Sequence, residues 1–525
     1  MKILITDPIE QSCVDILTRE GFTVDNRPGL PAEEIKACIG EYAALVVRSG
    51  TQVTADIINA AHSMQVIGRA GAGVDNIDSE SASRRGIIVM NTPGGNTVST
   101  AEHTVSMMLS LSRNIPQANA SLLAGKWERK KFMGAEVSGK TLGVVGLGKI
   151  GREVALRLKA FGMTVIGYDP VLASDVASKL GVELVDLPEL YRRSDFITVH
   201  TPMTEETKGL LNDETLAQCK KGVRIINCAR GGIVDEAALL RALESGHVAG
   251  AALDVFVKEP PTDHPLLKHP KVIATPHLGA STEEAQEKVA IQIAHQIADA
   301  LHNRGIAGAV NAVALQAGQP AEILPFLSLA EKIGKLIGQT MKGTLKEITV
   351  TLRGEMLEKY RELLKAGVLH GIFTKVIGEP VNYVNSPFIA EEMGIRMSEK
   401  KEVDGADYLQ LLSVEYATTS EKRTISGTVF GTTHPRLVRI DNYYFEVNPE
   451  GVMLVYTNID RPGMLASVGS ILAASNINIA GLSLGRSGVG EKALTIVAVD
   501  NEIPASVVKQ IEAVDGILDA RVVSL

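Results

Sequence analysis

The sequence contains few aromatic residues and few cysteines. Phenylalanine, tyrosine and tryptophan make up 4% of the 525 residues, whereas hydrophobic residues reach 45%. The four cysteines, Cys13, Cys38, Cys219 and Cys228, form no CxxC pair. This spacing indicates neither a zinc knuckle nor a redox dithiol, and we predict no metal site. Unpaired cysteines suit a reducing compartment, so we expect a cytoplasmic protein.

Long apolar runs and an excess of positive charge are also lacking. No stretch approaches the roughly 20 apolar residues of a membrane span, and no apolar segment precedes the first predicted strand. We therefore expect neither a signal peptide nor contact with a membrane. The 53 basic and 61 acidic residues give a net charge of −8, which argues against a nucleic-acid partner. The length exceeds that of one core, so we expect three or more domains.

The first 300 residues alternate apolar runs with helical spacing, a pattern typical of parallel sheets covered by helices. We expect strands at 2–6, 43–48, 65–69, 86–90, 141–145, 164–168, 196–200, 224–227, 250–254 and 272–275, and helices at 11–20, 100–113 and 282–302. The helix at 100–113 has Thr97, Ser99 or Thr100 available as its cap. The helix at 282–302 is expected to return to the first domain.

From about residue 345 the pattern changes to alternating strands. They are expected at 347–352, 429–431, 438–440 and 442–447, after a crossover rich in Gly, Ala and Pro at 307–320. The last part reads as β-α-β-β-α-β, with elements at 452–457, 464–475, 477–486, 492–500, 504–513 and 517–523. That order is typical of a ferredoxin-like fold.

A glycine-rich turn follows the strand at 141–145 and precedes a predicted helix. Gly146 permits the tight turn, Gly148 lets the backbone approach a pyrophosphate, and Gly151 lets the helix pack closely on the strand. The first N–H groups of that helix favour phosphate charge. Strand, turn and helix together indicate a dinucleotide site.

Asp169 lies at the end of the next strand. Its carboxylate is placed to accept hydrogen bonds from ribose hydroxyls and would repel a 2′-phosphate, which favours NAD over NADP. An aspartate before Pro170 is also an ordinary turn residue. The glycine turn upstream favours the cofactor role.

Three charged residues follow later strands of the same predicted sheet: Arg230, Glu259 and His277. Hydride transfer from a secondary alcohol needs a base for the hydroxyl proton and a cation for a carboxylate or carbonyl. An acidic partner orients the histidine. Each residue alone has an ordinary surface role, but their shared place at carboxyl ends of strands indicates an active site.

These motifs resemble those of the D-isomer-specific 2-hydroxyacid dehydrogenase family, and the resemblance covers essentially the whole chain. The matching segments are GLGKIG from Gly146, NCARGG from Asn227, DVF from Asp254 with Glu259-Pro260, and PHLG from Pro276. Two more, RAGAGVDNID from Arg69 and WERKKFMG from Trp127, are similar to the long members that act on phosphoglycerate.

The resemblance implies reversible oxidation of 3-phospho-D-glycerate to 3-phosphohydroxypyruvate with NAD, the step that opens serine biosynthesis. It makes His277 the general acid/base, Glu259 its charge partner and Arg230 the group that orients the substrate. Asp254 would hold the carboxamide side of the nicotinamide. The implied cofactor site consists of Gly146, Gly148, Lys149, Ile150, Gly151, Asp169, Thr201, Cys228, Ala229, Arg230, Asp254, His277 and Gly279.

A phosphorylated hydroxy acid needs further cations. Arg48 and Arg69 lie at strand ends of the first domain and suit a phosphate or carboxylate, although either could pair with a surface carboxylate instead. Asn96 adds a polar contact. Arg129 lies in a charged run, which is usually a solvated face. In the family this segment crosses a dimer interface, which implies a homo-oligomer, a dimer or a tetramer.

The C-terminal part resembles an ACT domain, a small ligand-sensing module that binds serine in related dehydrogenases. Asp460 is placed to meet the serine amino group, with Asn458 and Asn478 as further hydrogen-bonding groups. Both residue types are also ordinary turn residues. The middle region resembles the intervening domain of the long enzymes. His434 with Arg436 and Arg439 forms either an anion site there or an exposed basic hairpin.

We therefore predict an α/β fold in which a Rossmann-like doubly wound NAD domain (98–283) is inserted in a flavodoxin-like substrate-binding domain (1–97 and 284–312). An α+β intervening domain (315–447) and a ferredoxin-like ACT regulatory domain (452–525) follow. One alternative is a glyoxylate, hydroxypyruvate or D-lactate reductase, which needs no phosphate-binding arginines and no sensor. The other is an NAD(H)-sensing transcriptional co-repressor, which the C-terminal domain and the Trp127 segment disfavour.

Overall fold

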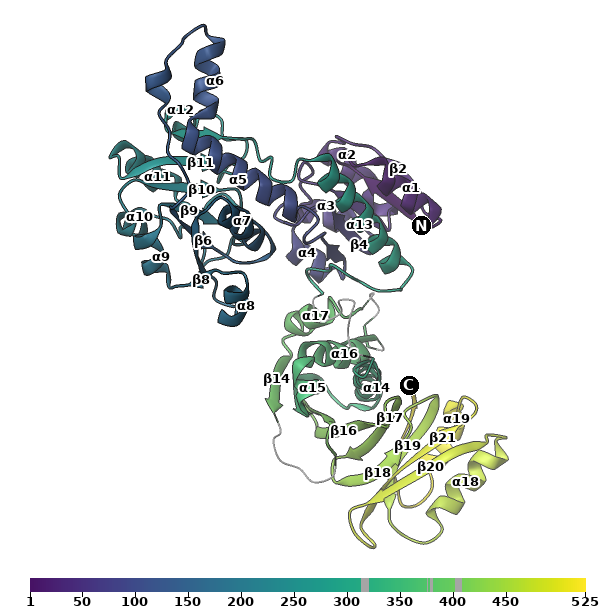
Figure 1. The fold of residues 1–525 in the computed structure, drawn as a ribbon. Coiled ribbons are helices and arrows are strands. Elements are labelled where there is room, and N and C mark those ends of the chain that lie inside the picture. The colour runs from purple at the N-terminus through teal and green to yellow at the C-terminus, as the bar shows by residue number, and fades with distance from the viewer. Residues whose placement is uncertain (313–320, 375, 378–380, 402–407) are drawn as a thin grey trace.

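The computed structural model describes residues 1–312, 321–374, 376–377, 381–401 and 408–525, which contain four sheets (Figure 1). The first sheet has five parallel strands in the order β2-β1-β3-β4-β5. Its strands are β1 (Lys2–Ile5), β2 (Thr23–Asn26), β3 (Ala44–Val47), β4 (Val66–Arg69) and β5 (Ile88–Met90). The first helices are α1 (Gln11–Arg19), α2 (Ala32–Cys38), α3 (Ala55–Ala60) and α4 (Ser79–Arg84), with a 3-10 turn at Ile39–Glu41.

A much later helix completes this first unit. Helix α13 (Glu283–Leu301) packs against α1, and its Ile293 and Ile297 are buried in one cluster with Ile3 and Val46. The chain therefore leaves the first sheet after β5, builds a second sheet and returns. The inserted arrangement predicted from the sequence is confirmed.

The second sheet has seven parallel strands in the order β12-β11-β10-β9-β6-β7-β8. They are β6 (Thr141–Val145), β7 (Thr164–Tyr168), β8 (Glu183–Leu184), β9 (Phe196–Val199), β10 (Val223–Asn227), β11 (Val248–Leu253) and β12 (Val272–Ala274). The helices are α5 (Thr97–Arg113), α6 (Ile115–Leu123), α7 (Lys149–Ala160), α8 (Ser174–Lys179), α9 (Leu187–Arg193), α10 (Asp213–Gln218), α11 (Glu236–Glu244) and α12 (Pro265–Lys268), with a 3-10 turn at Arg129–Phe132. Strand order reverses between β6 and β9, which is where such sheets bind ligands.

The predicted cap of α5 is wrong. The helix begins at Thr97 and its N-cap is Asn96, whose side chain makes no capping bond. The hydroxyls of Ser99 and Thr100 donate instead to the backbone oxygen of Gly279, at 2.8 and 3.0 Å. These hydroxyls serve a tertiary contact, which the local sequence does not reveal.

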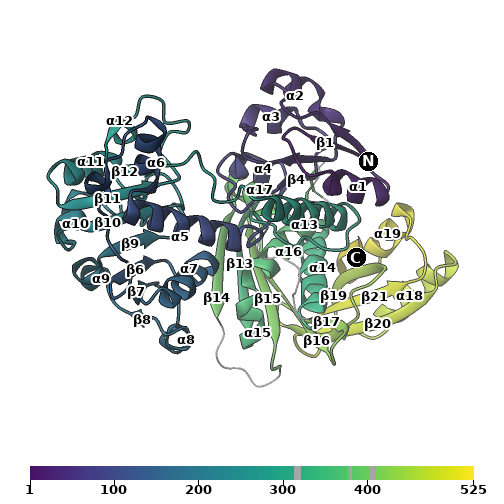
Figure 2. The ribbon, with the colours of Figure 1, turned by 45° about the horizontal axis from the view of Figure 1, so that its top comes forward.

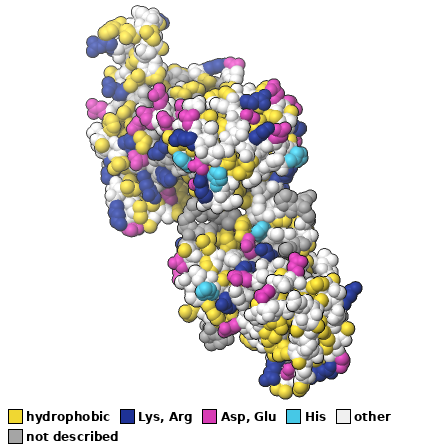
Figure 3. Space-filling model, turned by 90° about the vertical axis from the view of Figure 1, so that its right-hand side faces the viewer, with side chains coloured by type: hydrophobic (Ala, Val, Ile, Leu, Met, Phe, Trp, Pro, Cys, Tyr) yellow, Lys and Arg dark blue, Asp and Glu magenta, His cyan; other side chains and the backbone are white. Residues whose placement is uncertain are grey.

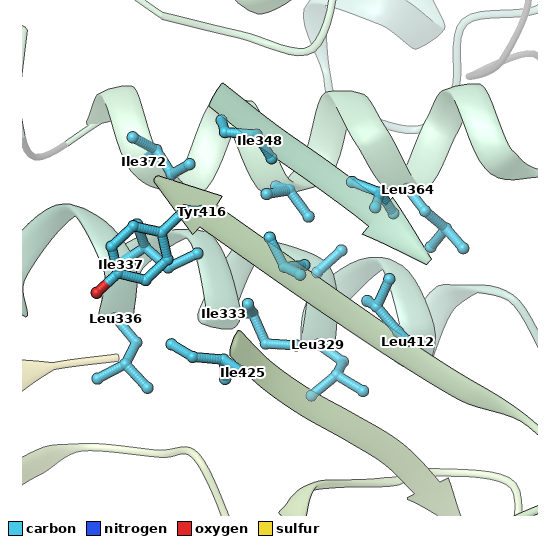
Figure 4. Packing of buried hydrophobic residues seen from close by; sticks show 14 of the residues in the cluster. Leu329, Ile333, Leu336, Ile337, Ile348, Leu364, Ile372, Leu412, Tyr416 and Ile425 are labelled. Carbon is cyan, nitrogen blue, oxygen red and sulfur yellow. The ribbon is translucent and has the colours of Figure 1, made fainter. Parts of the chain in front are cut away.

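The third sheet has six strands in the order β14-β13-β15-β16-β17-β18, mixed in direction. They are β13 (Leu345–Arg353), β14 (Arg396–Lys401), β15 (Leu411–Thr418), β16 (Lys422–Phe430), β17 (His434–Ile440) and β18 (Tyr443–Val447). The helices of this unit were not predicted from the sequence; they are α14 (Leu324–Thr340), α15 (Glu355–Lys359), α16 (Arg361–Thr374) and α17 (Ser386–Glu392). Figure 4 shows Leu329, Ile333 and Ile337 of α14 packed against these strands. The predicted boundary at 315 lies outside the described residues.

The fourth sheet is antiparallel, in the order β20-β21-β19-β22. Its elements are β19 (Val452–Ile459), α18 (Met464–Ala474), β20 (Ile479–Arg486), β21 (Lys492–Val499), α19 (Ala505–Glu512) and β22 (Ile517–Ser524), close to the predicted ones. Figures 1 and 2 place this unit beside the third sheet and away from the seven-stranded sheet. In the described parts of the chain, no helix is long and apolar enough to span a membrane.

Candidate active site

The predicted histidine and glutamate form a pair. Glu259 follows β11 and His277 follows β12, and His277 Nδ1 lies 2.8 Å from Glu259 Oε2. The other carboxylate oxygen accepts a hydrogen bond from the N–H of Phe256 at 3.1 Å. Because a carboxylate only accepts, Nδ1 carries the proton. The histidine side chain is 45% exposed, so the imidazole is held from one side and remains accessible for proton exchange.

Arg230 lies at the edge that faces the first unit. The loop after β10 approaches the loop after β11 so closely that a Cβ on Gly231 would lie 2.0 Å from the Phe256 oxygen. Arg230 Nε pairs with Asp75 Oδ2 at 3.0 Å, and Nη1 donates to the Ala229 oxygen at 2.7 Å. Asp75 belongs to the loop after β4, so this ion pair joins the two α/β units.

The sequence did not single out Asp75, the carboxylate that pairs with Arg230. Its only signal was its place in the RAGAGVDNID segment, which was quoted for its resemblance without a role for the aspartate.

Arg69 lies beside Arg230. Burial and the neighbouring Arg230 lower the pKa of Arg69 to about 10, so its guanidinium stays charged at neutral pH. One of its nitrogens donates to the Gly73 oxygen. Arg48 follows the adjacent strand β3, and its Nη1 lies 3.3 Å from the Pro8 oxygen and 3.4 Å from Gln286 Oε1. The structure thus brings Arg69 to Arg230 and keeps Arg48 at the end of the neighbouring strand.

The structure does not bring Arg129 of this chain to Arg48, Arg69 or Arg230. It lies in the 3-10 turn after α6, and within the described residues no hydrogen bond or ion pair joins it to the parts of the chain around them. Figure 1 shows that helix α6 and the segment after it, through the 3-10 turn (residues 115–132, the α6 arm), project from the rest of the unit. Figure 3 shows hydrophobic and basic side chains on this arm. Leu123 and Trp127 are among its exposed apolar residues.

Two glycines of the 146–151 turn, Gly146 and Gly151, have a steric reason. Gly146 has a φ of +90°, and a Cβ there would lie 2.6 Å from the His200 oxygen. A Cβ on Gly151 would lie 2.0 Å from the Gly146 oxygen, whereas the space beside Gly148 is open. The hydroxyl of Thr201, next to Gly146, is buried without a hydrogen-bond partner in the described structure. An open helix N-terminus and a buried hydroxyl without a partner fit a pyrophosphate.

Asp169 accepts three backbone hydrogen bonds. Oδ2 accepts from Leu147 at 2.8 Å, and Oδ1 accepts from Val171 and Leu172, both at 2.9 Å. Burial acts to raise the pKa of Asp169, but these hydrogen bonds outweigh it and lower the pKa below its ordinary value. The carboxylate is therefore ionised at neutral pH and retains accepting capacity for ribose hydroxyls.

The remaining predicted cofactor residues line the same edge. Lys149 Nζ reaches the Pro93 oxygen at 3.4 Å, while Ile150 is half-buried against the core. Burial raises the pKa of the Cys228 thiol to about 12, so this cysteine can line a site but is not a nucleophile. Asp254 is buried and binds the backbone of Gly279.

The three predicted sensor residues do not meet one another. Among the described residues Asn458 Oδ1 is buried without a hydrogen-bond partner, Asp460 lies 3.6 Å from Arg486 Nη1, and Asn478 donates to Asp500 at 2.7 Å. His434, Arg436 and Arg439 all lie on β17.

Comparison with known proteins agrees with this organisation. Family models match residues 105–279 (D-isomer specific 2-hydroxyacid dehydrogenase, NAD binding domain), 322–441 (D-3-phosphoglycerate dehydrogenase intervening domain) and 452–516 (ACT domain). D-3-phosphoglycerate dehydrogenase of Archaeoglobus fulgidus is 43% identical over the full length of both chains. The chain belongs to the D-3-phosphoglycerate dehydrogenase family. The human member is 45% identical and is matched over 91% of each chain.

A solved structure supports the cofactor of this family. D-lactate dehydrogenase from Aquifex aeolicus, complexed with NAD and lactic acid, is similar with a TM-score of 0.51 and 28% identity, over 57% of this chain and 96% of that one. Together with the NAD-binding family model, it identifies NAD as the cofactor. That match covers 57% of this chain, whereas the Archaeoglobus fulgidus relative is matched over all of it.

Proposed function

We propose that this protein catalyses the NAD-dependent, reversible oxidation of 3-phospho-D-glycerate to 3-phosphohydroxypyruvate, the step that opens serine biosynthesis. One observation carries the proposal: Arg230, on the seven-stranded sheet that also carries the His277–Glu259 pair, lies beside Arg69 at the end of β4 in the other unit, and Arg48 follows the adjacent strand β3. A substrate with a carboxylate at one end and a phosphate at the other needs such a spread of cations. Relatives matched over at least 91% of the chain are named D-3-phosphoglycerate dehydrogenase.

The residues have separate roles in this mechanism. His277 takes the proton of the substrate C2 hydroxyl through Nε2, while Glu259 stabilises the imidazolium that forms. Arg230 binds the carboxylate and polarises the C2 oxygen. Arg48 and Arg69 bind the phosphate, with Asn96 as a neutral contact. NAD, held along the 146–151 turn, supplies the hydride acceptor.

A steady-state assay tests this function. NADH oxidation with 3-phosphohydroxypyruvate should exceed that with glyoxylate or pyruvate by at least about 100-fold in kcat/KM, because only the phosphorylated acid uses the extra cations. Faster turnover of glyoxylate would instead favour the smaller reductases of the family. NADH binding without turnover of any 2-oxo acid would favour the co-repressor alternative.

The role of Arg48 can be separated from that of the catalytic pair. Arg48→Gln should raise KM for phosphohydroxypyruvate without raising KM for glyoxylate, because only the former carries a phosphate. An equal rise for both substrates would place Arg48 at the shared carboxylate instead.

We further infer that L-serine binds the C-terminal unit. Asn458 has a buried Oδ1 without a hydrogen-bond partner in the described structure, and Asp460 comes two residues later, directly after β19; the first offers an acceptor and the second a charge for the amino acid. Calorimetric titration of serine into the full chain tests this, with Asp460→Ala as the variant. Binding unchanged by the substitution would reject the assignment.

Assembly and location complete the proposal. We propose a homo-oligomer formed partly through the α6 arm, where Leu122, Leu123 and Trp127 are exposed, with Arg129 reaching the neighbouring site. We also propose the domain division 1–97 with 284–312, 98–283, 315–447 and 452–525, and a cytoplasmic location, which the four free cysteines favour.

A further inference from the structure

A single buried carboxylate holds the loop that carries His277. Asp254 is 1% exposed. Its Oδ1 accepts the N–H of Leu278 at 2.7 Å and the hydroxyl of Thr275 at 2.5 Å, and its Oδ2 accepts the N–H of Gly279 at 2.8 Å. The two residues that directly follow the histidine are thus fixed by one side chain.

The backbone of His277 needs this support. Its φ is +55°, in the left-handed region that residues with a Cβ avoid. Such a conformation costs on the order of 1–3 kcal/mol and persists only where the surroundings impose it. The N–H of His277 donates to the backbone oxygen of Asp254 at 2.9 Å, so Asp254 binds the loop on both sides of the strained residue.

Asp254 in turn depends on a partner. A buried carboxylate is costly unless it is paired and hydrogen-bonded. His103 Nε2 lies 3.2 Å from Asp254 Oδ1 and 3.1 Å from the Thr275 hydroxyl. Because the carboxylate only accepts, Nε2 carries a proton. Within the described residues no lysine or arginine pairs with Asp254, so His103 is its partner of potential positive charge.

His103 lies on α5, a helix that also contacts the loop directly. It comes one turn after Ser99 and Thr100, whose hydroxyls donate to the Gly279 oxygen. Helix α5 packs on β10, β11 and β12. The same helix therefore holds the loop through the Gly279 oxygen and, by way of Asp254, through the N–H groups of Leu278 and Gly279.

We propose that His103 is a positioning residue: it fixes Asp254 and, through it, the loop that presents His277 for proton transfer. The proposal rests on the role proposed for His277. Displacement of a catalytic group by 1 Å can cost 10²-fold in rate. Loss of His103 should therefore slow the chemical step more than it weakens binding.

Amide hydrogen exchange in the chain without substrate tests the clamp directly. His103→Leu should increase the exchange rates at Leu278 and Gly279 by roughly tenfold, and His103→Gln, which retains a donor for Asp254, should restore them. His247→Leu is the matched control. His247 is half-buried in the same unit and bonds the Cys219 oxygen at 3.0 Å, away from the loop, so it should leave exchange there unchanged.

Kinetics tests the consequence. His103→Leu should lower kcat about tenfold, change KM for NADH less, and raise the kinetic isotope effect with NADH deuterated at C4, because hydride transfer becomes slower. A merely destabilised fold would not raise the isotope effect. His103→Gln should recover most of the rate.

The outcomes separate clearly. Unchanged exchange at Leu278 and Gly279, or increased exchange with unchanged kcat and isotope effect, overturns the proposal. Faster exchange with a raised isotope effect and rescue by glutamine supports it. If the parent enzyme turns over no 2-oxo acid, the proposed function fails, and the exchange data still decide whether His103 clamps the loop.

Discussion

At the scale of single residues, the proposed chemistry depends on one imidazole held by one carboxylate. His277→Ala removes the group proposed to move the proton, so hydride transfer should fall by roughly 10²–10⁴-fold while NADH still binds. Glu259→Gln keeps a hydrogen-bonding group at 2.8 Å but removes its charge, and should give an intermediate loss. Single-turnover kinetics and NADH fluorescence titration measure the two effects separately. Loss of NADH binding in His277→Ala would assign this residue to the cofactor site instead.

A second histidine, His200, should affect the stability of the fold. His200 follows β9, its Nδ1 is buried without a hydrogen-bond partner in the described structure, and burial lowers its pKa to about 4. In the unfolded chain a histidine titrates near 6.5. Between these values the unfolded state binds more protons. The contribution of neutral His200 to folding is therefore complete above pH 6.5 and is lost as the pH falls towards 4.

This difference is worth on the order of 3 kcal/mol at most. His200→Gln should flatten the dependence of the urea midpoint on pH between 4.5 and 7. Circular dichroism at a series of pH values measures it, with the exposed His62→Gln as the control. Parallel curves for His200→Gln and the parent chain would contradict the assignment.

At the scale of elements, Gly73 in the loop after β4 leaves room for the Arg230 guanidinium beside Asp75. A Cβ on Gly73 would lie 2.0 Å from Arg230 Nη2 and 2.7 Å from Asp75 Oδ2. Gly73→Ala should therefore push Arg230 from its place and lower kcat/KM for the 2-oxo acid about 100-fold, with NADH affinity unchanged. Gly469→Ala is the control, because α18 has open space there. Unchanged kcat/KM in Gly73→Ala would show that Arg230 is not confined by this loop.

Local patterns predicted both parallel sheets except their edge strands β2 and β8, because short sequence segments reveal buried strands and glycine turns. They also predicted His277, Glu259 and Arg230 as one group, because the carboxyl ends of parallel strands share an edge. They did not predict Asp75 or His103. Both act through contacts between distant segments, and His103 lies on an otherwise ordinary helix.

The middle of the chain was harder to predict for a different reason. Helices α14 and α16 cross where a Cβ on Gly371 would lie 2.1 Å from the Glu331 oxygen, and one on Gly334 would lie 2.1 Å from the Val368 oxygen. Glycine lowers helix propensity, so residues that serve this close crossing weaken the helical pattern in sequence. Tertiary packing supplies the stability that propensity does not.

At the scale of the whole molecule, the C-terminal unit is not independent of the unit before it. One face of its sheet is covered by its own helices, and the other contributes Met453, Leu494, Ile496 and Val523 to the core built around α14. Gln339 of α14 also exchanges hydrogen bonds with the backbone of Ser524, at 3.0 and 3.1 Å. The last unit therefore contacts α14 directly. The sequence suggests a separate module, because the β-α-β-β-α-β order does not reveal what covers the open face.

Fragments test this shared core. Each of the four side chains is at most 2% exposed, and exposing each one would cost roughly 1.5–3 kcal/mol, which in sum is comparable to the whole stability of a small domain. Residues 321–525 should therefore unfold in one cooperative transition, whereas 452–525 alone should melt at a clearly lower temperature and bind a hydrophobic dye. In the longer fragment, Ile496→Ser should destabilise by about 2–4 kcal/mol, while Leu482→Ser, at an exposed site of the same sheet, should have little effect. Circular dichroism melting measures all four. Equal melting temperatures for the C-terminal unit alone and in the longer fragment would show that the two cores are energetically separate.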